Sequence, residues 1–72
     1  MNKLEILILD RRNGVIASEH IDPASAMAFF RRTGHVNRYN ILAKKGPAVL
    51  YIEKIDVATI HTQLNDFNLN NQ

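Results

Sequence analysis

The stretch Glu19-His20-Ile21-Asp22-Pro23-Ala24-Ser25 decides the fold, because a second version of it follows 34 residues later as Glu53-Lys54-Ile55-Asp56-Val57-Ala58-Thr59. Glu, Ile, Asp and Ala stand at the same positions in both versions, and Thr replaces Ser. In each version an extended apolar run ends at an Asp, whose carboxylate accepts hydrogen bonds from free amides at a helix start. The sequence therefore predicts two tandem strand-strand-helix units, at residues 1–34 and 35–68.

The first unit is predicted to be a hairpin followed by a helix. Residues 4–9 and 15–21 are apolar runs of strand length. Asn13-Gly14 between them tolerates positive φ, which favours a tight hairpin turn. Asp22-Pro23 marks the start of a helix, and Gly34 is a suitable cap just past its end.

The second unit repeats this order. Strands are predicted at residues 38–44 and 48–55, joined by the turn 45–47, and a helix is predicted from Asp56. The helix has an apolar stripe at helical spacing, made of Val57, Ile60, Leu64 and Phe67. The polar tail, residues 69–72, is expected to fray.

Two ββα units most simply give an α+β fold, with one four-stranded antiparallel sheet and both helices on one face. The repeat would then place a pseudo-twofold axis within a single domain, residues 1–72. Strand order stays open at this point. At 72 residues without cysteine, the core is small and has no disulfide to support it, so homodimerisation would add stability.

Composition and motifs argue against catalysis. The three histidines lack the spacing of a helical metal site, and no nucleophile elbow or phosphate-binding glycine loop occurs. The repeated Glu and Asp residues could form paired carboxylates, but helix capping and solvated strand positions account for them. We expect no enzyme activity, metal, cofactor or small-molecule substrate. With neither a signal peptide nor a run of about 20 apolar residues, we expect a cytoplasmic protein without a membrane span.

Positive charge is concentrated in the middle of the chain. No Asp or Glu occurs from Pro23 through Ile52. The cationic residues of this interval, here called the basic cluster, are Arg31, Arg32, Arg38, Lys44 and Lys45. Asparagine and tyrosine residues interleave with them, as on many nucleic-acid-binding surfaces. A solvated surface is the alternative interpretation.

The second candidate surface is apolar. Leu7 and Leu9 alternate with Ile6 and Ile8 along the first strand, so the two pairs are expected on opposite faces. If the helices cover one face, Leu7 and Leu9 remain as an apolar patch, which is typical of a partner or dimer interface.

These observations favour a small non-catalytic binding protein, a stoichiometric regulator or inhibitor that contacts another protein or a second copy of itself. Small size and the absence of catalytic motifs are typical of accessory proteins of phages, plasmids or bacterial operons. The alternative hypothesis is a nucleic-acid-binding module that uses the basic cluster.

Overall fold

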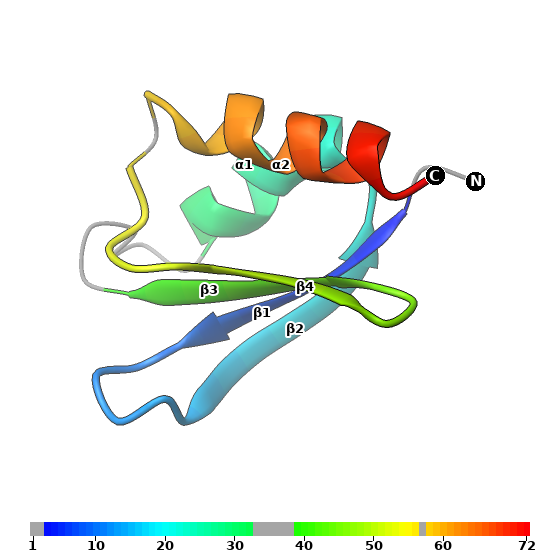
Figure 1. Ribbon diagram of the computed structural model, residues 1–72. Helices are drawn as coiled ribbons and strands as arrows, with labels where there is room; N and C mark the ends of the chain where they lie inside the picture. Colours follow the sequence, from blue (N-terminus) through cyan, green and yellow to red (C-terminus); the bar gives the residue numbers. More distant parts are fainter. Residues whose placement is uncertain (1–2, 33–38, 57) are drawn as a thin grey trace.

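The computed structural model describes residues 3–32, 39–56 and 58–72, which form four strands and two helices in the order ββαββα. The elements are β1 (Leu4–Leu9), β2 (Val15–Ile21), α1 (Pro23–Arg32), β3 (Asn40–Lys45), β4 (Ala48–Ile52) and α2 (Ile60–Asn70). The strands form one antiparallel sheet in the order β2-β1-β3-β4. The predicted α+β class is confirmed. Figure 1 shows α1 and α2 lying on the same side of the sheet.

The β1–β2 hairpin is closed by one carboxylate. The Asp10 Oδ1 atom accepts hydrogen bonds from the backbone N–H of Arg12 (2.9 Å) and of Gly14 (2.8 Å). Asn13 has φ of 61°, the left-handed conformation that asparagine tolerates. A Cβ atom at Gly14 would lie 3.0 Å from Asp10 Oδ2, so glycine leaves room for the carboxylate. The predicted Asn-Gly turn is thus built around Asp10.

The β3–β4 hairpin has a tighter turn, of Gly46 and Pro47 alone. Lys45 and Ala48 are its closing pair, and Gly46 has φ of +57°. Glycine before proline suits a two-residue hairpin turn with positive φ at its first position. The two hairpin turns lie at opposite ends of the sheet (Figure 1), because the central strands β1 and β3 are antiparallel.

The core lies between the sheet and the two helices. Its buried members are Leu4, Ile6, Ile8, Ala26, Phe29, Phe30, Ile41, Ala43, Ile52, Ile55, Ile60 and Leu64. The central strands contribute alternate residues to it, since Ile8 pairs with Ile41 and Ile6 pairs with Ala43 across the sheet. Phe30 of α1 is among the largest fully buried side chains. A single layer of apolar side chains thus fills the space between the sheet and the helices.

The 34-residue repeat is not confirmed in the strands. Ile8 is fully buried, whereas Leu42, 34 residues later, is only half-buried. The reverse holds for half-buried Leu7 and fully buried Ile41. Because side chains alternate along a strand, two residues that are equivalent in the sheet must differ in parity between β1 and β3. Because 34 is an even number, the repeat aligns residues of β1 with residues of β3 that lie on the opposite face of the sheet.

The repeat matches better at the turns that follow each hairpin. The Ser25 N–H donates to the Asp22 carbonyl, and the Thr59 N–H donates to the Asp56 carbonyl, both at 3.1 Å. The regular helix α2 nevertheless begins only at Ile60. The predicted start at Asp56 was wrong by about one turn, because Asp56 caps a separate turn ahead of the helix.

Other predicted boundaries shift or cannot be placed. Gly34, His35, Arg38 and Val57 lie outside the described residues. At the other end, α2 continues to Asn70, so part of the expected tail is helical.

Asp22 is the cap of α1. The Ser25 side chain and then the Ser25 backbone N–H, which lies 2.8 Å from Asp22 Oδ1, hydrogen bond to the carboxylate and lower the pKa of Asp22 below its ordinary value of 3.8. A carboxylate whose pKa is lower in the folded state stabilises the fold at pH values above its unfolded pKa. That stabilisation is lost as the pH falls through the folded pKa.

We therefore expect Asp22→Ala to lower the melting temperature at pH 7, with a gap to the wild type that narrows below about pH 4. Thermal unfolding followed by circular dichroism between pH 2.5 and 7 measures this gap. Asp22→Asn is the control, because it keeps a capping oxygen but does not titrate. A gap between Asp22→Ala and the wild type that stays constant with pH would contradict the assignment.

Candidate functional site

The face of the sheet turned away from the helices is crossed by one row of neighbouring residues. The row consists of Ser18 on β2, Leu7 on β1, Leu42 on β3 and Tyr51 on β4. The flanking residues Ile6 and Ala43 are buried under the helices. Alternation along each strand therefore directs the row to the opposite side.

This face is largely apolar and exposed. Of the large apolar side chains, Val49 is 59% exposed, Ile16 46% and Tyr51 45%, while Leu7 and Leu42 are half-buried between them. We call these five residues the open face. All four strands contribute to it, and exposed apolar surface of this kind usually marks an interaction site.

Of the two predicted interface residues, Leu7 belongs to the open face, whereas Leu9 is buried. The pairing of β1 with β2 shifts register between Ile8 and Leu9, where Leu9 pairs with Val15. The extra residue of this shift, Ile16, lies on β2, whereas Leu9 keeps its regular pairing with Asn40 on β3 and does not belong to the core between the sheet and the helices. The exposed fraction of Leu9 is nevertheless only 5%. Leu9 therefore offers little surface for a partner.

A hydrogen bond ties the open face to the first hairpin turn. The Tyr51 hydroxyl lies 3.3 Å from Asn13 Oδ1, although the two residues are 38 positions apart in the sequence. The contact brings the outermost strand β4 and the β1–β2 turn together.

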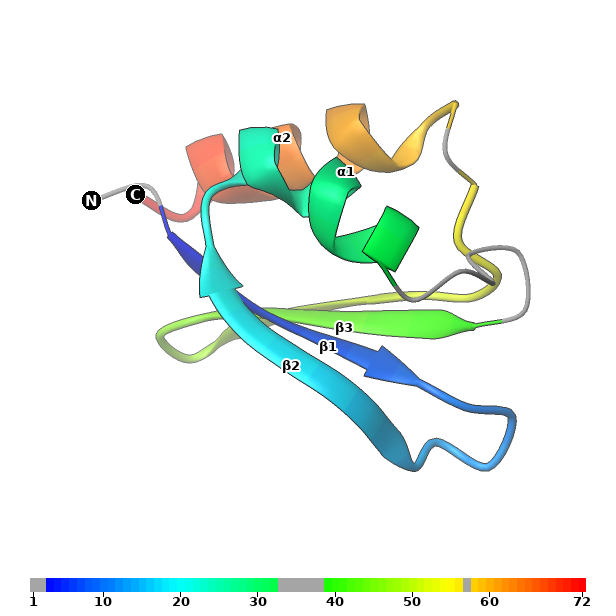
Figure 2. The ribbon, with the colours of Figure 1, turned by 180° about the vertical axis from the view of Figure 1, so that it is seen from behind.

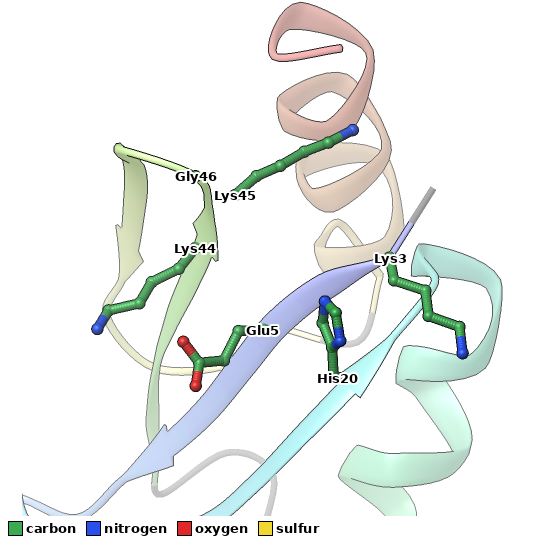
Figure 3. A pocket seen from close by; sticks show the side chains of 6 residues that line it. All are labelled: Lys3, Glu5, His20, Lys44, Lys45 and Gly46. Carbon is green, nitrogen blue, oxygen red and sulfur yellow. The ribbon is translucent and has the colours of Figure 1, made fainter. Parts of the chain in front are cut away.

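One end of the open face borders a shallow polar hollow of about 440 Å³ (Figure 3). It is lined by Lys3, Glu5, His20, Lys44, Lys45 and Gly46. Across the sheet, Glu5 is the direct neighbour of both His20 and Lys44. Three ammonium groups and one carboxylate give this end of the sheet an excess of positive charge.

The arginines of the basic cluster lie on α1. Arg31 is exposed. Arg32 forms an ion pair with Glu19, with 2.7 Å between Nη2 and Oε1, and its guanidinium carbon lies 5.7 Å from the centre of the Phe29 ring. The Arg32 side chain is 61% exposed, so the ion pair adds little stability, but it holds the guanidinium against the protein.

Lys45 anchors the second helix to the sheet. Its Nζ atom donates hydrogen bonds to the side-chain oxygen (2.6 Å) and the carbonyl oxygen (3.3 Å) of Asn68. Asn68 is buried near the C-terminal end of α2, where the helix dipole favours a cation. In Figure 3 the Lys45 side chain extends toward α2, whereas the Lys44 side chain extends away from it.

The basic cluster is therefore not one surface. Arg31 and Arg32 end α1, while Lys44 and Lys45 end β3 at the opposite end of the molecule (Figure 2). Arg38 lies outside the described residues.

We expect Lys45→Met to lower the free energy of unfolding by about 1–3 kcal/mol, because the buried oxygens of Asn68 lose their donor. Lys44→Met is the matched control. Its side chain points away from α2, and the expected change is within about 0.5 kcal/mol. Urea unfolding of both variants measures the two changes, and equal losses would refute the anchoring role.

Within residues 3–32, 39–56 and 58–72, no three His, Asp or Glu side chains are grouped so that they could hold a metal ion. No helix in these ranges is long and apolar enough to cross a membrane. The carboxylates of Asp22 and Asp56 each accept a backbone N–H, from Ser25 and Ala58. Capping thus accounts for both.

Several residues of the site were not singled out from the sequence. Only strand order and register show that four further residues belong to the site, namely Glu5, His20, Val49 and Tyr51. The sequence signal that could have found them is alternation. Each lies next to a strongly apolar residue that turns out to face the helices.

Comparisons with protein-family models, with curated proteins and with solved structures gave no match.

Proposed function

We propose that this chain is a small non-catalytic binding protein, a stoichiometric regulator or inhibitor that occupies a surface of another protein through its open face. The observation that carries this proposal is the exposure of Ile16, Val49 and Tyr51 on a continuous sheet face whose centre is Leu7 and Leu42. Covering these side chains removes apolar area from water, which is the main source of association free energy.

A sheet is a suitable platform for this role. In the proposed arrangement, the tandem ββα units place both helices on one face, which leaves the other face free. Hydrogen bonds between all four strands hold the apolar side chains at fixed spacing, so little ordering is needed on binding.

The polar hollow would orient the partner. Lys3 and Lys44 add positive charge at one end of the open face, where Glu5 of β1 is the neighbour of Lys44. Charges at the rim of an apolar interface mainly raise the association rate and select against wrong partners. The arrangement therefore favours a partner with an apolar surface bordered by acidic side chains.

Nucleic-acid binding is the second candidate, and one observation favours it. The open face combines a stackable ring, Tyr51, with Lys44 in the neighbouring row. Against it, Arg32 is paired with Glu19 and Lys45 with Asn68, so two members of the basic cluster are engaged within the chain. A protein partner accounts for more of the exposed apolar surface.

The test compares variants of the open face with a matched control. Ile16→Asp and Leu42→Asp place a charge on the open face, whereas Leu69→Asp alters a leucine on α2 that is somewhat more exposed than Ile16 (56% against 46%). The immobilised proteins are incubated with cell lysate, with and without nuclease treatment, at 50 and 500 mM salt, and retained proteins are quantified by mass spectrometry.

We expect specific proteins to be retained by the wild type and by Leu69→Asp at both salt concentrations, and to be lost from the two open-face variants. Retention that survives both open-face substitutions would overturn the proposal. Binding that disappears with nuclease, or that falls by orders of magnitude with salt, would support the nucleic-acid alternative instead.

A further inference from the structure

The outer edge of β4 lacks the features that protect sheet edges. Its sequence, Ala-Val-Leu-Tyr-Ile, contains no charge and no proline, and its pairing with β3 is regular. The other edge strand, β2, carries Glu19 and His20, and its register shifts opposite Ile8/Leu9. Charges and bulges are the usual means by which proteins prevent edge-to-edge pairing. Within the described ranges, β4 pairs only with β3, so this edge is unprotected.

The register shows which backbone groups point outward from β4. Lys45 and Ala48 close a two-residue turn, so they form a hydrogen-bonded pair. Hydrogen-bonded and non-bonded pairs alternate in an antiparallel ladder. Leu50 therefore directs its N–H and C=O toward β3, whereas Val49 and Tyr51 direct theirs away from the sheet.

We propose that this edge pairs antiparallel with β4 of a second copy of the chain, about a twofold axis at Leu50. In that register Val49 of each copy lies opposite Tyr51 of the other. Both residues present outward-directed backbone groups, so each pair exchanges two hydrogen bonds. The alignment needs no change in the backbone of either copy.

The side chains of β4 are complementary to themselves under this symmetry. On the open face each Val49 meets a Tyr51 of the second copy, and pairs of a β-branched with an aromatic residue are favourable across strands. On the helix side Leu50 meets its own symmetry mate, and both are half-buried in the free chain. Because β4 has no charged side chain, the twofold axis brings no like charges together.

The dimer would join two four-stranded sheets into one of eight strands. The twofold axis is perpendicular to the sheet, so the helices of both copies share one side and the two open faces form one continuous surface. A five-residue edge covers far less than the roughly 800 Å² per partner of a standard interface. Association is therefore weak and depends on concentration.

The test measures mass and amide exchange over a range of concentrations. Sedimentation equilibrium should show the wild type rising from 8.2 kDa toward twice that mass between micromolar and millimolar concentration. Over the same range, the exchange of the Val49 and Tyr51 amides should slow by tenfold or more. The Ser18 amide on β2 also points outward, since its neighbour Leu7 bonds toward β3, and its exchange should not change.

Val49→Pro removes one outward N–H without breaking the β3–β4 ladder, and should be monomeric throughout. Ser18→Pro makes the same change on β2 and should dimerise as the wild type does. If either proline variant fails to fold by circular dichroism, lysine variants replace the pair. Val49→Lys should then abolish the dimer and Val15→Lys, at 57% exposure against 59%, should retain it.

The proposal is overturned if the wild type stays monomeric to millimolar concentration, or if the dimer persists in the Val49 variants. It does not depend on the proposed function. Ile16→Asp, on the far strand β2, should lose the captured partner but keep the dimer. The two proposals can therefore fail separately.

Discussion

Burial of the central strands under two helices is the constraint on which the rest of the structure depends. Ile6, Ile8 and Ile41 are fully buried against a layer that includes Phe30. In the described residues, two helices cover one face of the four strands. The other face must then meet water, and the apolar residues on it are exposed rather than lost within a second layer.

The small core also explains how the charged residues are used. Lys45 bonds to Asn68 and so fixes the end of α2, and Arg32 folds back onto Glu19 beside α1. Lys45 holds the helix layer to the sheet through a buried acceptor, whereas the exposed Arg32–Glu19 ion pair adds little stability. Lys44 differs because its side chain points away from α2 (Figure 3), at the rim of the open face. The side chains of Lys44 and Lys45, which are adjacent in β3, thus lie on opposite sides of the sheet.

Local chemistry could be predicted from the sequence, whereas pairing between distant segments could not. The cap at Asp22 and the turn before Gly14 each depend on contacts within a few residues, and both were confirmed. Strand order depends on pairing between distant strands, which no local pattern specifies. The similarity of the two units was misleading for the same reason. Residues 34 positions apart, such as Ile8 and Leu42, lie on opposite faces of the sheet.

The central claim, that the sheet is covered on one side only, can be tested by methyl NMR with a soluble gadolinium chelate at low protein concentration. The account predicts strong relaxation enhancement for the methyl groups of Ile16 and Val49, and weak enhancement for those of Ile8 and Ile41. Equally weak enhancement for all four would mean that the open face is buried within the single chain. That result would contradict the account.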